Sequence, residues 1–274
     1  MIIDSHTHLS GPPFNEETLY TTYPDGGGFD MGIERAACHI DFLLSDMEER
    51  GVDKALVMGL PEMITNKQLS DLVKKHPDKI TGFAGVRDPK SEDAIRELDH
   101  SVKELGLRGL KLHPDCHSFS PSDREIVPLI RRAAELDVPT LIHSYPGGMR
   151  RGYFGIAAPD TIDDLKAQVP EATIIIGHMG YPRYLDLLTV AQIPGVFVET
   201  SWGLTSIAEL HGLGFTARFL RMIGVDNVLF GSDWVGKQVG MEQEKQLELI
   251  NKLDLTREER NKILGGNISK ILKI

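Results

Sequence analysis

The sequence predicts an α/β protein that folds as a single (β/α)₈ (TIM) barrel over residues 1–274. Three observations support this fold class. Eight short apolar segments, rich in β-branched residues, alternate with longer segments of helical periodicity. Successive apolar segments are mostly about 25 to 35 residues apart, which is the length of a βαβ repeat. A chain of 274 residues is also close to the usual size of such a barrel.

The predicted strands are these eight apolar segments, each of which ends near polar or glycine residues. They cover residues 2–8, 54–59, 80–86, 109–113, 139–144, 173–179, 196–201 and 227–233. Helices are predicted between them, several after a Ser, Thr or Asp that can cap a first turn. The clearest helical segments are residues 36–50, 68–75, 91–105 and 122–136. No glycine-rich phosphate-binding turn follows a predicted strand, which argues against a doubly wound open sheet.

Two segments depart from the repeat. Residues Ser10 to Gly32 are rich in Gly, Pro and Tyr, and we expect this long loop after the first strand to cover the barrel mouth. The final segment begins with a capping-box pattern from Thr256 to Glu259 and continues as an apolar-periodic stretch. We expect it to form a C-terminal helix that packs against the barrel.

The composition of the chain indicates which class of binding partner to expect. The formal charge of −10 opposes binding to a phosphate backbone, so a small-molecule substrate is expected rather than a nucleic acid. The sequence contains no secretory signal and no apolar stretch long enough to span a membrane, so we expect a cytoplasmic protein. Cys38 and Cys116 show no disulfide-scaffold spacing and are expected to be thiols.

Polar side chains are concentrated where the predicted strands end. Active sites of (β/α)₈ barrels lie at the carboxyl ends of their strands, so these residues are the candidates for chemistry. They are His6, His8, Lys111, His113, His143, His178 and Asp233. Two imidazoles that project from one strand, as His6 and His8 do, suggest a metal ion.

The motifs that contain these residues are "DSHTH", "GLKLHP", "LIHS", "IIGHMG", "LFGSDW" and the terminal "GGN". In this order and spacing, the sequence resembles the amidohydrolase superfamily across the whole chain. Within it, the sequence is similar to the amidohydrolase-related (amidohydrolase 2) branch, which contains metal-dependent hydrolases and decarboxylases of the aminocarboxymuconate-semialdehyde type. The motifs are specific for the fold and the metal site, and much less so for the reaction.

The resemblance implies that His6, His8, His143 and Asp233 bind one divalent ion. Zinc suits these ligands, while manganese and iron are alternatives. The resemblance also implies that His178 transfers protons close to a metal-activated water, and Asp233 is the other candidate for this role.

Lys111, His113 and Arg87 each have two interpretations. In binuclear members of the superfamily a carboxylated lysine bridges two metals, so Lys111 is either such a bridge or a charged residue of the barrel mouth. His113 could belong to a second metal site or to an ordinary loop. Arg87 could bind a substrate carboxylate or form a salt bridge with Asp88. Glu199 is given no role.

The predicted activity is metal-dependent hydrolysis of a small, carboxylated molecule. The alternative on the same site is non-oxidative decarboxylation of an unsaturated or aromatic acid by a carboxy-lyase. A TatD-like DNase is a more distant alternative, which the net charge disfavours. A barrel with a purely structural metal is disfavoured because such a site needs no base like His178. Homodimers are common in the family, so a homodimer is expected from the resemblance.

Overall fold

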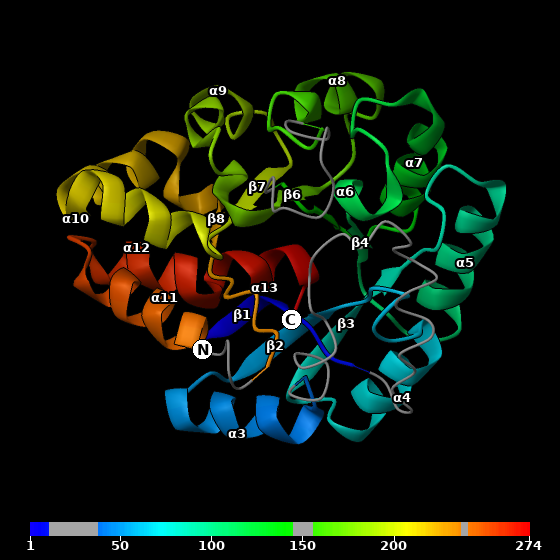
Figure 1. The fold of residues 1–274 in the computed structure, drawn as a ribbon, viewed down its shortest axis with the longest axis horizontal. Helices are drawn as coiled ribbons and strands as arrows, with labels where there is room; N and C mark the ends of the chain where they lie inside the picture. Colours follow the sequence, from blue (N-terminus) through cyan, green and yellow to red (C-terminus); the bar gives the residue numbers. More distant parts are fainter. Residues whose placement is uncertain (11–37, 145–155, 237–240) are drawn as a thin grey trace.

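The computed structural model describes residues 1–10, 38–144, 156–236 and 241–274. Within these ranges eight parallel strands follow one another around a sheet in chain order, with helices on the outside (Figure 1). The strands are β1 (Ile3–Thr7), β2 (Lys54–Met58), β3 (Ile80–Gly85), β4 (Leu110–Leu112), β5 (Thr140–Ile142), β6 (Ile174–Ile176), β7 (Val196–Glu199) and β8 (Val228–Leu229). Each lies inside a segment that the sequence predicts to be a strand.

Backbone hydrogen bonds between the first and last strands close the sheet. The amide of Ser5 donates to the carbonyl of Phe230 at 2.8 Å, and the amide of Asp233 donates to the carbonyl of His6 at 2.8 Å. The amide of His8 extends this pairing to the carbonyl of Trp234, also at 2.8 Å. The predicted (β/α)₈ barrel is therefore confirmed, and its closure places the first and eighth strands side by side.

Helices connect successive strands, and the four most clearly predicted segments are all helical. The helices of at least four residues between strands are α3 (Ile40–Arg50), α4 (Asn66–Lys75), α5 (Glu92–Lys103), α6 (Pro114–His117), α7 (Val127–Glu135), α8 (Thr161–Gln168), η2 (Gly177–Gly180), α9 (Leu187–Val190) and α10 (Gly203–Ile223). Short 3₁₀ turns are η1 (Arg124–Ile126), η3 (Tyr184–Asp186) and η4 (Val225–Asn227). The expected lid, residues 10–32, lies outside the described residues apart from Ser10.

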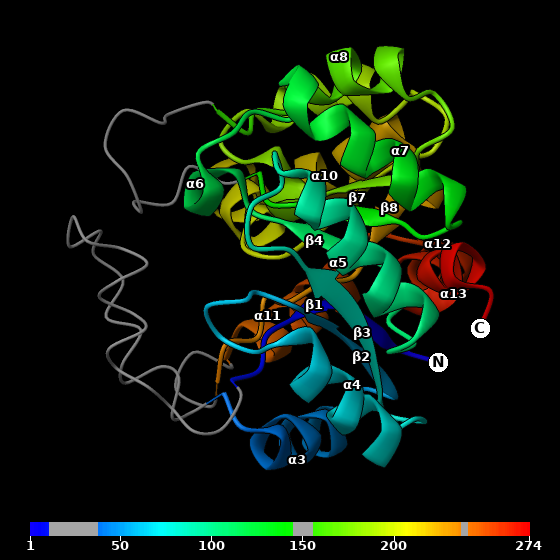
Figure 2. The same ribbon diagram turned by 90° about the vertical axis from the view of Figure 1, so that its right-hand side faces the viewer.

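The C-terminal segment covers one end of the barrel. After α11 (Met241–Lys252) come α12 (Arg257–Asn261), the π-helical turn η5 (Lys262–Gly266) and α13 (Asn267–Leu272). The predicted capping box is present, because Thr256 and Glu259 each bond the other's backbone amide. Figure 2 shows α13 beside the N-terminus, at the end of the barrel opposite α6. The carboxyl ends of the strands, with their polar residues, lie at the other end of the barrel.

Two apolar clusters form the core. One lies inside the barrel, where α13 adds side chains to those of the strands; it comprises Ile3, Leu56, Met58, Phe83, Leu141, Ile175, Leu229, Ile268 and Leu272. The larger cluster lies between the strands and the surrounding helices. Burial of this apolar surface is the main stabilising contribution to the barrel, and it fixes the strand ends that carry the polar residues.

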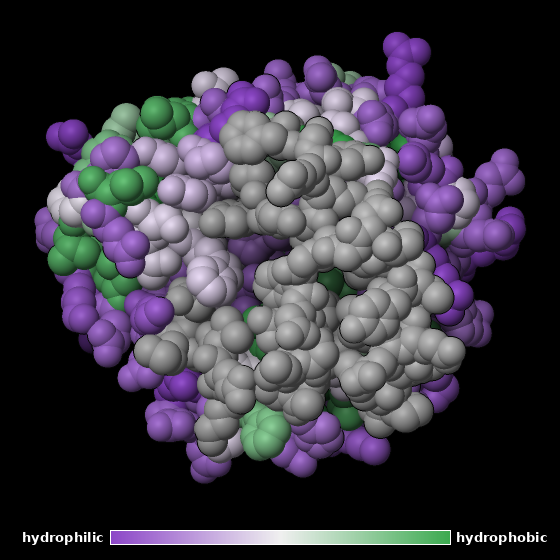
Figure 3. All heavy atoms as spheres, in the orientation of Figure 1, coloured by the Kyte–Doolittle hydropathy of each residue, from purple (hydrophilic) through white to green (hydrophobic). Residues whose placement is uncertain are grey.

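Few large apolar side chains are exposed in the described ranges. Three of them, Leu210, Leu213 and Met222, lie on α10, where Figure 3 shows apolar atoms among polar ones. None of the described helices combines the length and the apolarity needed to cross a bilayer.

Asn267, the last residue of the "GGN" motif, ties the C-terminal helix to β8. Its buried amide nitrogen donates to the carbonyls of Val225 and Val228, both at 2.8 Å. We expect Asn267→Ala to lower the free energy of unfolding by about 1–3 kcal/mol, because one buried and one partly buried carbonyl lose their donor. Urea denaturation measures this change. The exposed Asn261→Ala is the control, and equal midpoints for the two variants would contradict the assigned role.

Candidate metal centre

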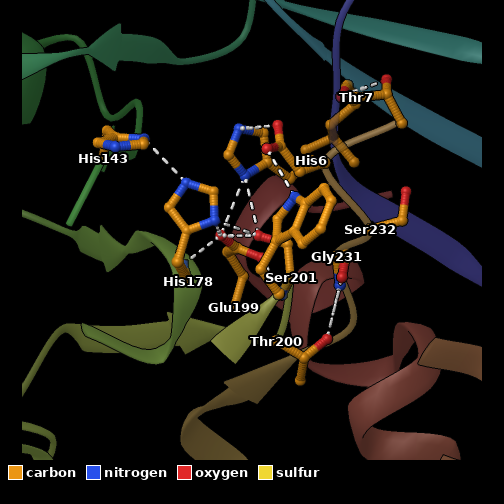
Figure 4. Close-up of polar contacts among 12 residues, drawn as sticks. His6, Thr7, His143, His178, Glu199, Thr200, Ser201, Gly231 and Ser232 are labelled. Carbon is orange, nitrogen blue, oxygen red and sulfur yellow. Dashed lines mark hydrogen bonds and ion pairs between the residues drawn. The ribbon is translucent and has the colours of Figure 1, made fainter. Parts of the chain in front are cut away.

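The carboxyl ends of four strands bring five of the predicted polar residues together, and Figure 4 labels His6, His143 and His178 among them. His6 and His8 come from β1 and the residue after it, and Asp233 follows β8. His178 lies in η2 just after β6, and His143 directly follows β5. Because the segment after β8 pairs with β1, residues that are far apart in the sequence meet here.

His6, His8 and Asp233 converge on one point. Nε2 of His6 lies 3.1 Å from Nε2 of His8, and Oδ1 of Asp233 lies 3.3 Å and 3.1 Å from these two atoms. The described chain thus gathers three metal-ligating atoms within 4.8 Å of one another. Such atoms repel one another unless they share a proton or a cation. The donor set of two imidazoles and a carboxylate fits a divalent metal ion.

The protonation states of His6, His8 and Asp233 also favour binding of a cation. Burial lowers the pKa of both His6 and His8, and the charge of Lys111 lowers it further. Burial on its own raises the pKa of Asp233, but His6 and His8 hold it well below its ordinary value. Neutral imidazoles and an ionised carboxylate are the protonation states in which these groups bind metals.

Lys111 projects from β4 into the same cluster. Its Nζ lies 3.0 Å from Nε2 of His6, and the side chain is almost completely buried. Burial lowers the pKa of Lys111 to about 8, although the charges of Asp233 and Glu199 oppose this shift. A cationic amine so close to the cluster can balance the charge of an anionic substrate, or of the two carboxylates.

His143 is not part of the group formed by His6, His8 and Asp233. Its Nδ1 lies 2.8 Å from Nε2 of His178, and its ring stacks on that of His113 at 3.8 Å between centroids. His143 therefore contacts the centre through His178, whose ring lies 5.1 Å from that of His6. His113, Asp115 and His143 form another group of three potential metal ligands within 4.8 Å.

The backbone is strained at three residues of the centre. His178, Trp202 and Asp233 have φ angles of 56°, 52° and 57°, in the left-handed region that residues other than glycine seldom adopt. Each follows a strand end. Such conformations cost about 1–3 kcal/mol each and persist where surrounding contacts impose them, often at functional sites. The turn places the Asp233 carboxylate where Nε1 of Trp202 donates to its Oδ2 at 3.0 Å.

Some candidates lie elsewhere. Arg87 is exposed, and its side chain forms no ion pair with a described residue, including Asp88. His117 also lies outside the centre and contacts Glu62, with 3.2 Å between Nε2 and Oε1. Trp234 is fully buried and donates to Asp46, so it packs in the barrel wall.

Sequence reasoning missed Glu199 and Ser201. Glu199 ends β7 fully buried, and its Oε1 lies 3.0 Å from Nδ1 of His6. Ser201 Oγ lies 2.8 Å from Nδ1 of His178. A Cβ at Gly231 would collide with Oε2 of Glu199, so the glycine of "LFGSDW" makes room for this carboxylate. The available signal was an acidic residue at the carboxyl end of an otherwise apolar strand.

Comparison with known proteins identifies the family. A family model described as amidohydrolase matches residues 3–274. The chain belongs to the amidohydrolase family. This amidohydrolase is therefore an enzyme of the superfamily that its sequence motifs resemble, and its relatives include hydratases and decarboxylases of the same branch.

Two curated relatives cover most of this amidohydrolase. A 2-keto-4-carboxy-3-hexenedioate hydratase of Sphingobium is 27% identical over 242 residues, which are 75% of this chain and 69% of the hydratase. A gamma-resorcylate decarboxylase of Polaromonas is 24% identical over 253 residues, 76% of this chain and 75% of the decarboxylase.

A solved structure shows the same fold. It is the 5-carboxyvanillate decarboxylase of Novosphingobium aromaticivorans, complexed with manganese and 4-hydroxy-3-methoxy-5-nitrobenzoic acid. It is 18% identical, has a TM-score of 0.77, and the match covers 100% of this chain and 96% of the decarboxylase.

Proposed function

We propose that this amidohydrolase binds one divalent metal ion and uses water to hydrolyse a small, carboxylated molecule. The observation that carries the proposal is the convergence of His6 Nε2, His8 Nε2 and Asp233 Oδ1 within 3.3 Å, on the open end of the barrel. A third histidine, His178, lies beside this group, with its ring centroid 5.1 Å from that of His6, and is proposed to transfer protons.

The proposed ligands are His6, His8, His143 and Asp233. When bound, a divalent ion would supply a Lewis acid that polarises the substrate and lowers the pKa of a water molecule. Hydrogen bonds between such ligands and the groups behind them fix the orientation of the ligands. Glu199 does this for His6, and Trp202 does it for Asp233.

His178 is the proposed proton acceptor. Burial lowers its pKa to about 4, against the opposing charges of Glu199 and Asp233, so the imidazole is neutral near neutral pH. A neutral imidazole has one nitrogen that can accept a proton and later return it to a leaving group. In His178 this nitrogen, Nε2, would have to exchange its contact with His143 for the water. Asp233 lies close to the same point and can share this role.

The proposed substrate class follows from charge. Lys111 is the buried cation of the centre, and its amine can bind a substrate carboxylate. The curated relatives also support a carboxylated substrate, because the names of the hydratase and the decarboxylase both describe acids. The hydratase, like a hydrolase, consumes water.

Decarboxylation is the second candidate. The gamma-resorcylate decarboxylase and the structurally similar 5-carboxyvanillate decarboxylase favour it, since both remove a carboxyl group from an aromatic acid. In that reaction Lys111 would hold the departing carboxylate and His178, once protonated, would donate a proton to the ring carbon.

Product analysis in ¹⁸O-labelled water separates the two reactions. Metal-loaded protein is incubated with carboxylated lactones and with hydroxybenzoates. We expect one ¹⁸O atom in the product with no release of carbon dioxide, and no reaction after chelation of the metal. Release of carbon dioxide with a product free of ¹⁸O would overturn hydrolysis in favour of the carboxy-lyase.

Three finer expectations remain proposals. Zinc is the proposed ion because it binds histidine and carboxylate ligands, while a related solved structure contains manganese. A homodimer and a cytoplasmic location stay predictions.

A further inference from the structure

We infer that Glu199 and Ser201 are positioning residues that set which nitrogen of His6, His178 and His143 carries the proton. Only the expected effect on turnover rests on the proposed function. The hydrogen-bond pattern itself follows from contacts between these five side chains, and Figure 4 shows Glu199 and Ser201 lying between the histidines.

The pattern begins at Glu199, whose oxygens accept hydrogen bonds from backbone amides. Oε1 accepts from the amide of His178 at 2.6 Å, and Oε2 accepts from the amide of Ser201 at 2.7 Å. Amides can only donate, so both oxygens act as acceptors. A carboxylate with this many donors has no proton to give to its remaining partners.

The first consequence concerns His6. Its Nδ1 lies 3.0 Å from Oε1 of Glu199, and 3.5 Å from Oγ of Ser201. Since Glu199 is an acceptor, Nδ1 carries the proton. A neutral imidazole then has its lone pair on Nε2, the atom that converges with His8 and Asp233. Glu199 therefore prepares His6 to bind a metal through Nε2.

The second consequence passes through Ser201. Its hydroxyl has one hydrogen, which it donates to Oε1 of Glu199 at 2.8 Å. The contact of 2.8 Å between Oγ and Nδ1 of His178 must then be donated by His178. His178 is thus a neutral imidazole with its proton on Nδ1 and its lone pair on Nε2. This is the less common tautomer of histidine in water, so the protein has to impose it.

The third consequence concerns His143. Nε2 of His178 lies 2.8 Å from Nδ1 of His143, and because His178 accepts there, His143 donates. The lone pair of His143 then lies on Nε2, which lies 3.9 Å from Oδ2 of Asp115. One carboxylate on β7 in this way determines the proton positions of three imidazoles.

The ring tautomers can be measured directly. Long-range ¹H–¹⁵N spectra of the zinc-loaded protein, labelled with ¹⁵N in its histidine rings, distinguish a protonated nitrogen from one with a lone pair, and His178→Gln assigns the His178 signals. We expect protonated Nδ1 and unprotonated Nε2 in wild type. Ser201→Ala should move the proton of His178 largely to Nε2, whereas Ser201→Thr, which keeps the hydroxyl, should retain the wild-type pattern.

Two results would overturn the inference: a wild-type His178 protonated on Nε2, or a Ser201→Ala protein whose His178 signals match those of wild type. The wild-type spectrum decides the matter even when a variant fails to fold. It needs no substrate, so it also separates failure of this inference from failure of the proposed function.

Turnover provides a second readout. With a substrate found in the ¹⁸O assay, Ser201→Ala is expected to lower kcat by about 10- to 100-fold, the usual effect of removing a partner that orients a residue of a metal centre. KM should stay unchanged, and Ser201→Thr should restore most of kcat. An unchanged kcat in Ser201→Ala would contradict a role for the tautomer in turnover.

Discussion

Asp233→Asn is expected to lose its metal and to reduce kcat by about 10²–10⁴-fold, the range for removing a proton-transfer residue. Asparagine keeps the size of the side chain, so the barrel should fold. It removes a charge that offsets Lys111, and it leaves Nε2 of His6 and Nε2 of His8 without the carboxylate that they share. Metal content and kcat, measured on the same preparation, test this expectation.

A second Asp→Asn exchange serves as the control. Asp226 is exposed and pairs with Lys262 at the surface, where an ion pair contributes little. Asp226→Asn should therefore retain both metal and turnover. An Asp233→Asn protein with wild-type metal content and kcat would show that this carboxylate is neither a ligand nor a base.

Glu199→Ala is expected to have the largest effect on stability. At least three buried donors lose their acceptor, on His178, Ser201 and His6, at about 1–3 kcal/mol each. A loss of about 3 kcal/mol or more follows, which lowers Tm by about 6–12 °C in a chain of this size. Thermal unfolding followed by circular dichroism measures it.

The Glu199 contribution should depend on pH. Burial raises the pKa of this carboxyl, but the contacts with His6 and His178 outweigh burial and lower the pKa from 4.5 to about 2. Since the pKa is depressed in the folded state, the stabilisation is complete above about pH 4.5 and is lost as pH falls towards 2. The difference in Tm between wild type and Glu199→Gln should therefore shrink on acidification. A difference that stays constant down to acidic pH would contradict ionised Glu199 as its source.

The fold could be predicted from sequence because its determinants are local and repeated. Each strand is a short apolar segment at a regular spacing, and the caps at Ser91 and Thr256 mark helix starts. Strand ends were less predictable. The segment from Asn227 was expected to continue as a strand to Asp233, but β8 ends at Leu229. Beyond it, Phe230, Asp233 and Trp234 bond to β1 through separate backbone contacts rather than a regular ladder.

The site was predictable only in part. His6 and His8 stand out because two like residues alternate on one strand, and Asp233 because a known motif contains it. Glu199 and Ser201 give no such pattern: a single acid after an apolar strand is equally consistent with a residue in a loop. Their role depends on contacts with β1 and η2, more than 20 residues away in sequence, which only the closed barrel defines.

Elemental analysis of the purified protein tests the central claim, a single divalent ion held by residues from the two ends of the chain. We predict about one ion per chain in wild type and in Lys111→Ala, and none in His6→Ala. About two ions in wild type, with a marked fall in Lys111→Ala, would contradict the single-ion site, and no metal in any of the three proteins would contradict the metal centre itself.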